Sequence, residues 1–263
     1  WSKVETFSSN MAVSSICQTV NGTFFVATGH QSEKISGSHD SGAHGYGIYK
    51  SEPDGSWTLI EGTQNYYYIN EVVCDDVNNV VWIASSNGLE TYDLSTDILE
   101  NVSSFDATSP CNSLSISKDG QVIIGHATSG GSRVLVSEDA GNSFTEVSNI
   151  GEEPGTINMS AVKRIEFAIS HEKVDGQYRV YASGAGTETS ILRGVWRSAD
   201  NGMSFNRIAP AYDGIPGGFS PFTSGGSGQG TYDNIITVVP GAPDRIILGG
   251  IDCYSWSTVD NWE

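Results

Sequence analysis

The chain has 263 residues, of which 31 are acidic and 13 basic, so its formal net charge at pH 7 is −18. Such a surface repels phosphate backbones and anionic lipid headgroups, which excludes nucleic acids and membrane surfaces as expected partners. Glycine is abundant with 31 residues, as in a folded, loop-rich protein, and no apolar run approaches the ~18 residues needed to cross a bilayer.

Five segments along the chain share one pattern, in which two β-rich runs flank a turn of Asn, Asp, Gly or Pro. Each of them predicts an antiparallel hairpin. In chain order they are SSICQTVNGTFFVATG (14–29), NEVVCDDVNNVVWIASS (70–86), NSLSISKDGQVIIGHA (112–127), VKRIEFAISHEKVDGQYRVYASGAG (162–186) and DNIITVVPGAPDRIILGG (233–250). The fourth copy carries an insertion, and Pro240 and Pro243 are expected to make the turn of the fifth.

A second turn motif follows each hairpin. SEDAGNSF (137–144) and SADNGMSF (198–205) both read Ser-x-Asp-x-Gly-x-Ser-Phe, and SEPDGSW (51–57), YDLSTDIL (92–99) and STVDNW (257–262) are weaker copies. The Asp side chain can accept hydrogen bonds within its own turn, Gly tolerates a positive φ, and the aromatic residue is expected to pack between sheets. The predicted structural residues are Ser137, Asp139, Gly141, Phe144, Ser198, Asp200, Gly202, Phe205, Asp54 and Trp57.

Two hairpins per repeat give four antiparallel strands, and repeated units of this size predict an all-β protein with the β-propeller fold. The expected single propeller comprises blades at 8–62, 63–105, 106–150, 151–210 and 211–263, with 1–7 as an outer strand of a preceding or ring-closing blade. Because both ends fall inside a repeat motif, we expect a section of a larger propeller within a multidomain chain. An array of immunoglobulin-like sandwiches is the alternative, which the in-register repeats disfavour.

The two full motifs resemble the Asp-box, or BNR repeat, of sialidases, sortilin-like receptors and secreted bacterial propellers, in which the box is structural. VVWIASSNGLETYD (80–93) is similar to blades of bacterial sensor-type propellers. GQGTYDNIITVVPGAPDRIILGGID (228–252) resembles blades of large surface proteins exported by type IX secretion. The resemblance covers nearly the whole chain and implies a secreted or cell-surface protein, but it does not imply one activity.

Catalytic signatures known from the resembling families are missing from the sequence. The sialidase resemblance would imply an Arg-Ile-Pro motif, yet Arg164-Ile165 is followed by Glu166 and Arg245-Ile246 by Ile247. Xyloglucan-cleaving enzymes of this fold use paired acids, and no spacing marks Asp40, Asp213 and Asp233 as such a pair. We therefore expect a non-catalytic binding, adhesion or scaffold module. A glycoside hydrolase fragment, xyloglucanase-like or sialidase-like, is the main alternative, and an assembly chaperone is a third.

Long irregular segments are expected to gather on the propeller face opposite the motif turns, where a rigid scaffold usually presents its recognition surface. They are His30–Gly47, Gly184–Gly194 and 211–230. The predicted ligand-binding residues on this face, for a glycan or a protein partner, are Tyr66, Tyr67, Tyr68, His39, Asp40, His44, Tyr212, Phe219 and Phe222. The alternative for the aromatic residues is that they close the mouth of the channel.

No cofactor is expected. His30, His39 and His44 with Asp40 could bind zinc, but a flexible solvated loop is the simpler interpretation. Calcium would suit the acidity, yet no D-x-D-x-D-G loop occurs. Cys17, Cys74, Cys111 and Cys253 form no CxxC pair, and free buried thiols are preferred. Cys17 and Cys74 occupy the same register of successive inner strands, which are usually too far apart for a disulfide.

Overall fold

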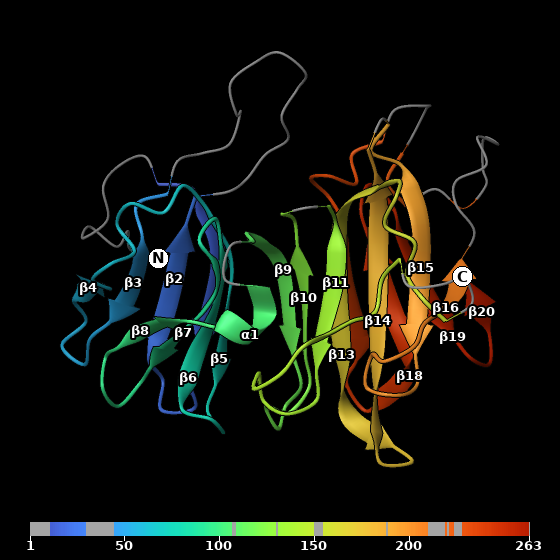
Figure 1. Cartoon of the computed structure of the whole chain (residues 1–263). Coiled ribbons are helices and arrows are strands. Elements are labelled where there is room, and N and C mark those ends of the chain that lie inside the picture. Colours follow the sequence, from blue (N-terminus) through green and yellow to red (C-terminus); the bar gives the residue numbers. More distant parts are fainter. Residues whose placement is uncertain are drawn as a thin grey trace. The chain divides into compact units, whose positions relative to one another are not determined.

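The computed structural model describes residues 11–29, 45–106, 109–129, 131–149, 155–187, 189–209, 219, 221–223 and 228–262. Within these residues, five four-stranded antiparallel sheets account for nearly all regular structure (Figure 1). In every sheet each strand pairs with the next strand in the sequence. The chain separates into two compact units, Trp1–Asn112 and Ser113–Glu263, which are described in turn.

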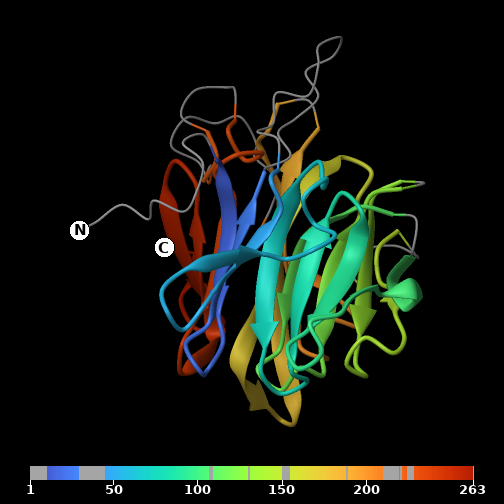
Figure 2. The same ribbon diagram turned by 90° about the vertical axis from the view of Figure 1, so that its left-hand side faces the viewer.

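The first unit contains two sheets and one short helix (Figures 1 and 2). The first sheet consists of β1 (Val13–Gln18), β2 (Phe24–Thr28), β3 (Ile48–Ser51) and β4 (Trp57–Leu59). The second consists of β5 (Ile69–Asp75), β6 (Val80–Ser85), β7 (Gly88–Asp93) and β8 (Leu99–Asn101), and α1 (Ser103–Asp106) follows it. Phe25, Ile48, Ile69 and Ile83 are among the buried residues that pack the two sheets together.

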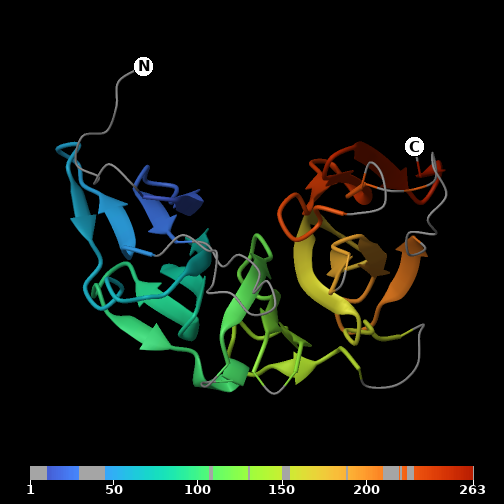
Figure 3. The ribbon, with the colours of Figure 1, turned by 90° about the horizontal axis from the view of Figure 1, so that it is seen from above.

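The second unit contains three sheets. The third sheet consists of β9 (Cys111–Ile116), β10 (Ile123–Ala127), β11 (Arg133–Ser137) and β12 (Thr145–Glu146), and the first two residues of β9 are counted with the first unit. The fourth consists of β13 (Val162–Val174), β14 (Gln177–Gly186), β15 (Leu192–Ser198) and β16 (Asn206–Ala209). The fifth consists of β17 (Ile235–Val239), β18 (Ala242–Gly249), β19 (Cys253–Ser257) and β20 (Asn261–Trp262). The fourth and fifth sheets lie side by side, with β13 against β17 (Figure 3).

The second strand is the most buried part of the first four sheets, whereas β18 of the fifth sheet is partly exposed. All five residues of β10 are buried, and in β14 only Gln177 is not. A strand with packed sheets on both faces needs apolar side chains throughout rather than in alternation. Phe205, the last residue of the second full motif, is fully buried in the cluster shared by the third and fourth sheets. Phe144 and Trp57, its counterparts in other copies, are half-buried.

The structure corrects two sequence-based boundaries. Gly184–Gly194 was expected to be an irregular loop, but β14 continues to Gly186 and β15 begins at Leu192. A Cβ at Gly184 or Gly194 would lie 2.9 or 2.8 Å from the Trp196 ring, so these glycines permit close packing inside strands. In the fifth hairpin, Pro240 and Gly241 form the turn, while Pro243 lies within β18.

The strands of each sheet fall inside one of the five expected blade ranges. The division of the chain into domains stays a prediction.

Candidate binding site

One end of each sheet carries the connections between strands one and two and between strands three and four, and we call it the turn end. The opposite end, with the connection between strands two and three, is the loop end. In the first full motif the Ser137 hydroxyl donates to Asp139 (2.8 Å) and accepts from the Gly141 N–H (2.9 Å). The Ser143 N–H (2.9 Å) and hydroxyl (2.6 Å) donate to the same carboxylate. These hydrogen bonds, with those from Ser143 the largest cause, lower the pKa of Asp139.

The second full motif repeats this network atom for atom. The Ser198 hydroxyl donates to Asp200 (2.6 Å) and accepts from the Gly202 N–H (2.9 Å). The Ser204 N–H (2.9 Å) and hydroxyl (2.5 Å) donate to Asp200. Burial opposes ionisation of Asp200, but hydrogen bonds from Ser198 and Ser204 outweigh it and lower the pKa. The glycines have φ values of +84° at Gly141 and +92° at Gly202, which confirms the backbone role predicted for them.

Two of the weaker copies keep an aspartate that accepts from a serine, but the serine follows two residues later instead of four. The Asp54 carboxylate accepts from the Ser56 N–H (2.9 Å) and hydroxyl (2.6 Å). Asp93 accepts from the N–H (2.8 Å) and hydroxyl (2.6 Å) of Ser95, and these hydrogen bonds lower the pKa of Asp93 to about 2. Loss of the glycine from the 92–99 copy therefore leaves the aspartate in its structural role.

The first hairpin of a sheet carries a related device that the sequence analysis missed. In the third sheet, the Ser117 hydroxyl donates to Asp119 (2.7 Å) and accepts from the Val122 N–H (2.9 Å). The two turns of this sheet are joined by a hydrogen bond from the Ala140 N–H to the Gln121 carbonyl (3.1 Å). Equivalent bonds run from Asn201 to Tyr178 (3.3 Å) and from Leu94 to Asn79 (3.0 Å). The signal was present as Ser-x-Asp-Gly at 117–120.

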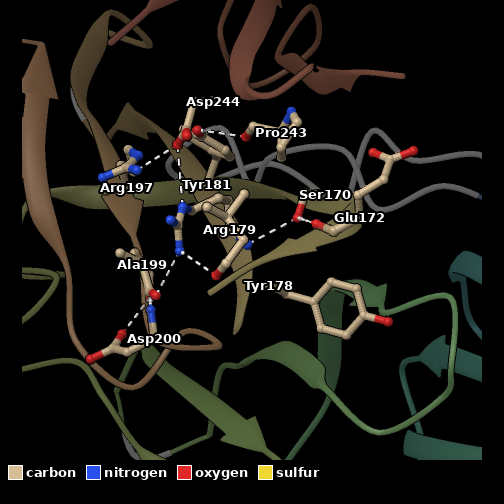
Figure 4. Close-up of polar contacts among 12 residues, drawn as sticks. Ser170, Glu172, Tyr178, Arg179, Tyr181, Arg197, Ala199, Asp200, Pro243 and Asp244 are labelled. Atoms are coloured by element: carbon tan, nitrogen blue, oxygen red, sulfur yellow. Dashed lines mark hydrogen bonds and ion pairs between the residues drawn. The ribbon is translucent and has the colours of Figure 1, made fainter. Parts of the chain in front are cut away.

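An ion cluster around the buried Arg179 joins the fourth and fifth sheets at the turn end, and its shared carboxylate, Asp244, is partly exposed (Figure 4). Asp244 of β18 accepts from Arg179 Nε (3.2 Å) and Arg197 Nη2 (2.5 Å). Arg179, whose side chain is 9% exposed, also donates to the Ala199 carbonyl (2.9 Å). The Tyr181 hydroxyl donates to the Pro243 carbonyl (3.0 Å). These groups bind each other across two sheets, so the arginines serve the scaffold.

The loop end of the second sheet is held by two buried tyrosines. Tyr66 is 4% exposed, and its hydroxyl donates to Glu90 (2.5 Å), which also accepts from the Ser85 hydroxyl (3.2 Å). Burial raises the pKa of both Tyr66 and Glu90. Tyr68 is 7% exposed, and its hydroxyl donates to the Asn112 side chain (3.3 Å). The segment that leads into β5 is therefore anchored on both sides of Tyr67.

Tyr67 itself points outward and is 46% exposed. Tyr67 lies at a bend just before β5, between the buried Tyr66 and Tyr68, and this bend leaves its ring facing solvent. The Tyr67 N–H donates to the Ser86 hydroxyl (3.1 Å), and its carbonyl accepts from the Gly45 N–H (3.1 Å). Gly45, which bonds to the Tyr67 carbonyl, is followed in the sequence by Tyr46, which is 48% exposed. We call Tyr46 and Tyr67 the tyrosine patch.

The tyrosine patch corrects the sequence-based site in two ways. Exposure was expected for all three consecutive tyrosines, but only Tyr67 is exposed, while Tyr66 and Tyr68 are core residues. Tyr46 was missed, although an aromatic residue between Gly45 and Gly47 at the entry to a strand was visible in the sequence.

The predicted phenylalanines also pack inside the protein. Phe222 is fully buried, and its ring lies so close to Gly250 that a Cβ there would be 2.6 Å away. The half-buried Phe219 ring contacts Tyr254 (4.8 Å between centroids) and Trp262 (4.5 Å). Phe222 is therefore not accessible to a ligand, and the Phe219 ring is only partly exposed. His39, Asp40, His44 and Tyr212 lie outside the described residues.

The described residues contain no group of three or more His, Cys, Asp and Glu side chains arranged to hold a metal ion. None of the helices described there is long and apolar enough to cross a membrane. The second unit has a cavity of about 310 Å³ along its inner strands β13 and β17. Its lining surface is about half polar and includes Ser115, Phe167, Ile169, His171, Val238 and Pro240.

Neither a protein-family model nor a curated protein matches the chain. Solved structures that are similar in fold include the following two. A chain from the crystal structure of a nidogen/laminin complex has a TM-score of 0.54 at 9% identity, covering 95% of this chain and 77% of that one. The GH74 xyloglucanase from Xanthomonas campestris has a TM-score of 0.55 at 14% identity, covering 92% of this chain and 36% of the enzyme. Together with the five four-stranded sheets, these likenesses show that the fold is a β-propeller, as the repeated turns predicted.

Proposed function

We propose that the chain is a non-catalytic binding module of a secreted or cell-surface protein and that its loop end recognises a glycan or a protein partner. In this proposal the Ser-x-Asp-x-Gly-x-Ser-Phe turns are Asp-box repeats, and their work is structural. The observation that carries the proposal is the tyrosine patch, Tyr46 and Tyr67, exposed at the loop end of the first unit.

The patch is suited to binding because its support is rigid. Tyr67 stands between two buried tyrosines whose hydroxyls are hydrogen-bonded, and its own backbone bonds to Ser86 and Gly45. A ring held in this way loses little conformational freedom when a partner covers it, which favours affinity. Tyrosine combines an apolar face with a polar edge and is common at recognition surfaces.

The net charge of the chain limits the chemical class of the partner. With a formal net charge of −18, the protein disfavours anionic polymers, so a neutral glycan or a neutral to basic protein surface fits best. Two aromatic faces on neighbouring chain segments suit stacking against sugar rings, and we favour a neutral glycan. One fold neighbour is part of a nidogen/laminin complex and the other is a xyloglucanase, so the fold supports either kind of partner.

A glycoside hydrolase is the main alternative, and such enzymes need two carboxyl groups facing the scissile bond. Two acids are instead engaged inside the described protein. Glu90 accepts from Tyr66 and Ser85, and Glu166 accepts from Arg164 (2.6 Å) and Ser113 (3.3 Å). These contacts favour a structural role for both acids and support the binding function.

The test is affinity electrophoresis of the full chain through gels containing neutral polysaccharides, xyloglucan among them, with laminin as an immobilised protein probe. We expect retardation by at least one probe and at least a tenfold loss of affinity in Tyr67→Ala and Tyr46→Ala. Val77→Ala is the matched control, because Val77 is 64% exposed at the turn end of the same unit.

The same samples are assayed for new reducing ends. Cleavage that disappears when one acidic residue is changed to its amide would overturn the proposal in favour of a hydrolase. Binding that survives both tyrosine substitutions, or no binding to any probe, would also overturn it.

A further inference from the structure

The inner strands of the first two sheets, β1 and β5, run in the same direction beside each other in the first unit. The Ser15 hydroxyl accepts from the Val72 N–H (3.1 Å) and donates to the Val72 carbonyl (3.5 Å). Further along, the Val20 N–H donates to both oxygens of the Asp76 carboxylate (3.0 Å each). These contacts fix the register of the two strands at both ends of a short interval.

Cys17 and Cys74 lie inside that interval. Cys17 is two residues beyond Ser15, and Cys74 is two residues beyond Val72. Because side chains alternate along a strand, Cys17 points to the same side of β1 as Ser15, which contacts β5. Both cysteines pack against the same apolar cluster. Both cysteines therefore lie where the two strands approach each other, and the two thiols are within hydrogen-bonding reach.

The pKa of Cys17 also indicates that the two thiols are close to each other. A hydrogen bond with the Cys74 side chain, followed by burial, raises the pKa of the Cys17 thiol. Both thiols are free in the structure, as expected from the sequence, but β1 and β5 approach each other more closely at this point than equivalent inner strands usually do. The Ser15 side chain bridges them directly, which shows how close the two backbones lie.

We propose that Cys17 and Cys74 form a disulfide in an oxidising compartment and so link the first sheet covalently to the second. With oxidised glutathione as the oxidant, one cysteine thiolate attacks a glutathione sulfur and one reduced glutathione leaves. The second cysteine, on losing its proton, attacks the protein sulfur of this mixed disulfide and expels the second glutathione. Two protein thiols are oxidised, and one glutathione disulfide is reduced to two thiols.

The other two cysteines provide internal controls. Cys111 is buried in β9, and Cys253 is exposed in β19 of the fifth sheet. They belong to different sheets, and neither takes part in the register of β1 and β5. If the alignment of β1 and β5 selects the oxidised pair, one defined disulfide forms. Indiscriminate oxidation would instead begin at the exposed Cys253.

The experiment uses the reduced full chain, equilibrated with oxidised glutathione, alkylated and digested without reduction for mass spectrometry. The expected result is one linked peptide pair containing Cys17 and Cys74, with Cys111 recovered alkylated. Thermal unfolding should shift upward by several degrees on oxidation, because the bond closes a long loop. Cys17→Ser and Cys74→Ser should each abolish the shift.

Recovery of Cys17 and Cys74 on separate alkylated or glutathionylated peptides would overturn the proposal, as would their linkage to Cys253. The peptide map of the unsubstituted chain decides the matter even if the serine variants fold poorly.

Discussion

The turn end and the loop end of the sheets differ in how regularly their contacts repeat. At the turn end, the networks around Asp139 and Asp200 match bond for bond, and neighbouring turns of a sheet bond to each other. At the loop end, by contrast, the exposed Tyr67 between two anchored tyrosines occurs in only one of the described sheets. Repetition therefore indicates scaffold, and departure from repetition marks the surface on which a specific function can be placed.

The largest expected effect comes from breaking the ion cluster at the turn end. Asp244→Ala would leave Arg179 and Arg197 without their shared carboxylate, and we expect a loss of about 3 to 4 kcal/mol in unfolding free energy. Asp252→Ala, an exposed position at the loop end of the same sheet, is the control. Urea unfolding measures both, and equal stability of the two variants would contradict the cluster's role.

The contributions of the two ends to stability should be lost in different pH ranges. His126 is 1% exposed at the loop end of the third sheet, and burial lowers its pKa to about 4. The unfolded chain binds this proton near pH 6.5, so stability should fall by about 3 kcal/mol between pH 6.5 and pH 4.

The turn-end carboxylates have lowered pKa values, so their stabilisation persists above about pH 4 and is lost only as the pH falls further. His126→Asn should flatten the curve between pH 6.5 and pH 4. An unchanged slope in that variant would assign the acid sensitivity elsewhere.

Removing one turn aspartate should have a smaller effect. Asp200→Ala deletes the acceptor for Ser198 and for the N–H and hydroxyl of Ser204, and we expect a loss of about 2 kcal/mol. Asp200→Asn, which keeps one acceptor oxygen, should lose less. If both variants unfold like the unsubstituted chain, the motif contributes no stability and its repetition needs another explanation.

The smallest effect on stability is expected in the tyrosine patch. Tyr67→Ala removes an exposed ring and should change the unfolding free energy by less than about 0.5 kcal/mol. Tyr66→Phe, in contrast, removes the buried hydroxyl that donates to Glu90 and should cost about 1 to 2 kcal/mol. The reverse ranking in thermal or urea unfolding would mean that the roles of the two neighbours are exchanged.

The sequence was sufficient for the features that depend on local chemistry. Ser-x-Asp-x-Gly-x-Ser-Phe specifies its own turn, so the positions of Asp139 and Asp200 followed from the pattern. Features that depend on packing were not predictable in this way. Gly184 and Gly194 were taken for loop residues because their packing against the Trp196 ring cannot be inferred from the sequence. The contact between Cys17 and Cys74 likewise depends on the spacing of β1 and β5. The outward orientation of Tyr67 required the partners of Tyr66 and Tyr68.

The turn end builds the scaffold, and we propose that the loop end of the first unit binds the partner. Hydrogen–deuterium exchange of the full chain, with and without the polysaccharide or protein probe that it binds most tightly, tests this directly. We predict slower exchange in the peptides containing 45–47, 66–68 and 86–87, with no change in 137–143 and 198–204. Protection of the two motif turns without protection around Tyr67 would contradict it.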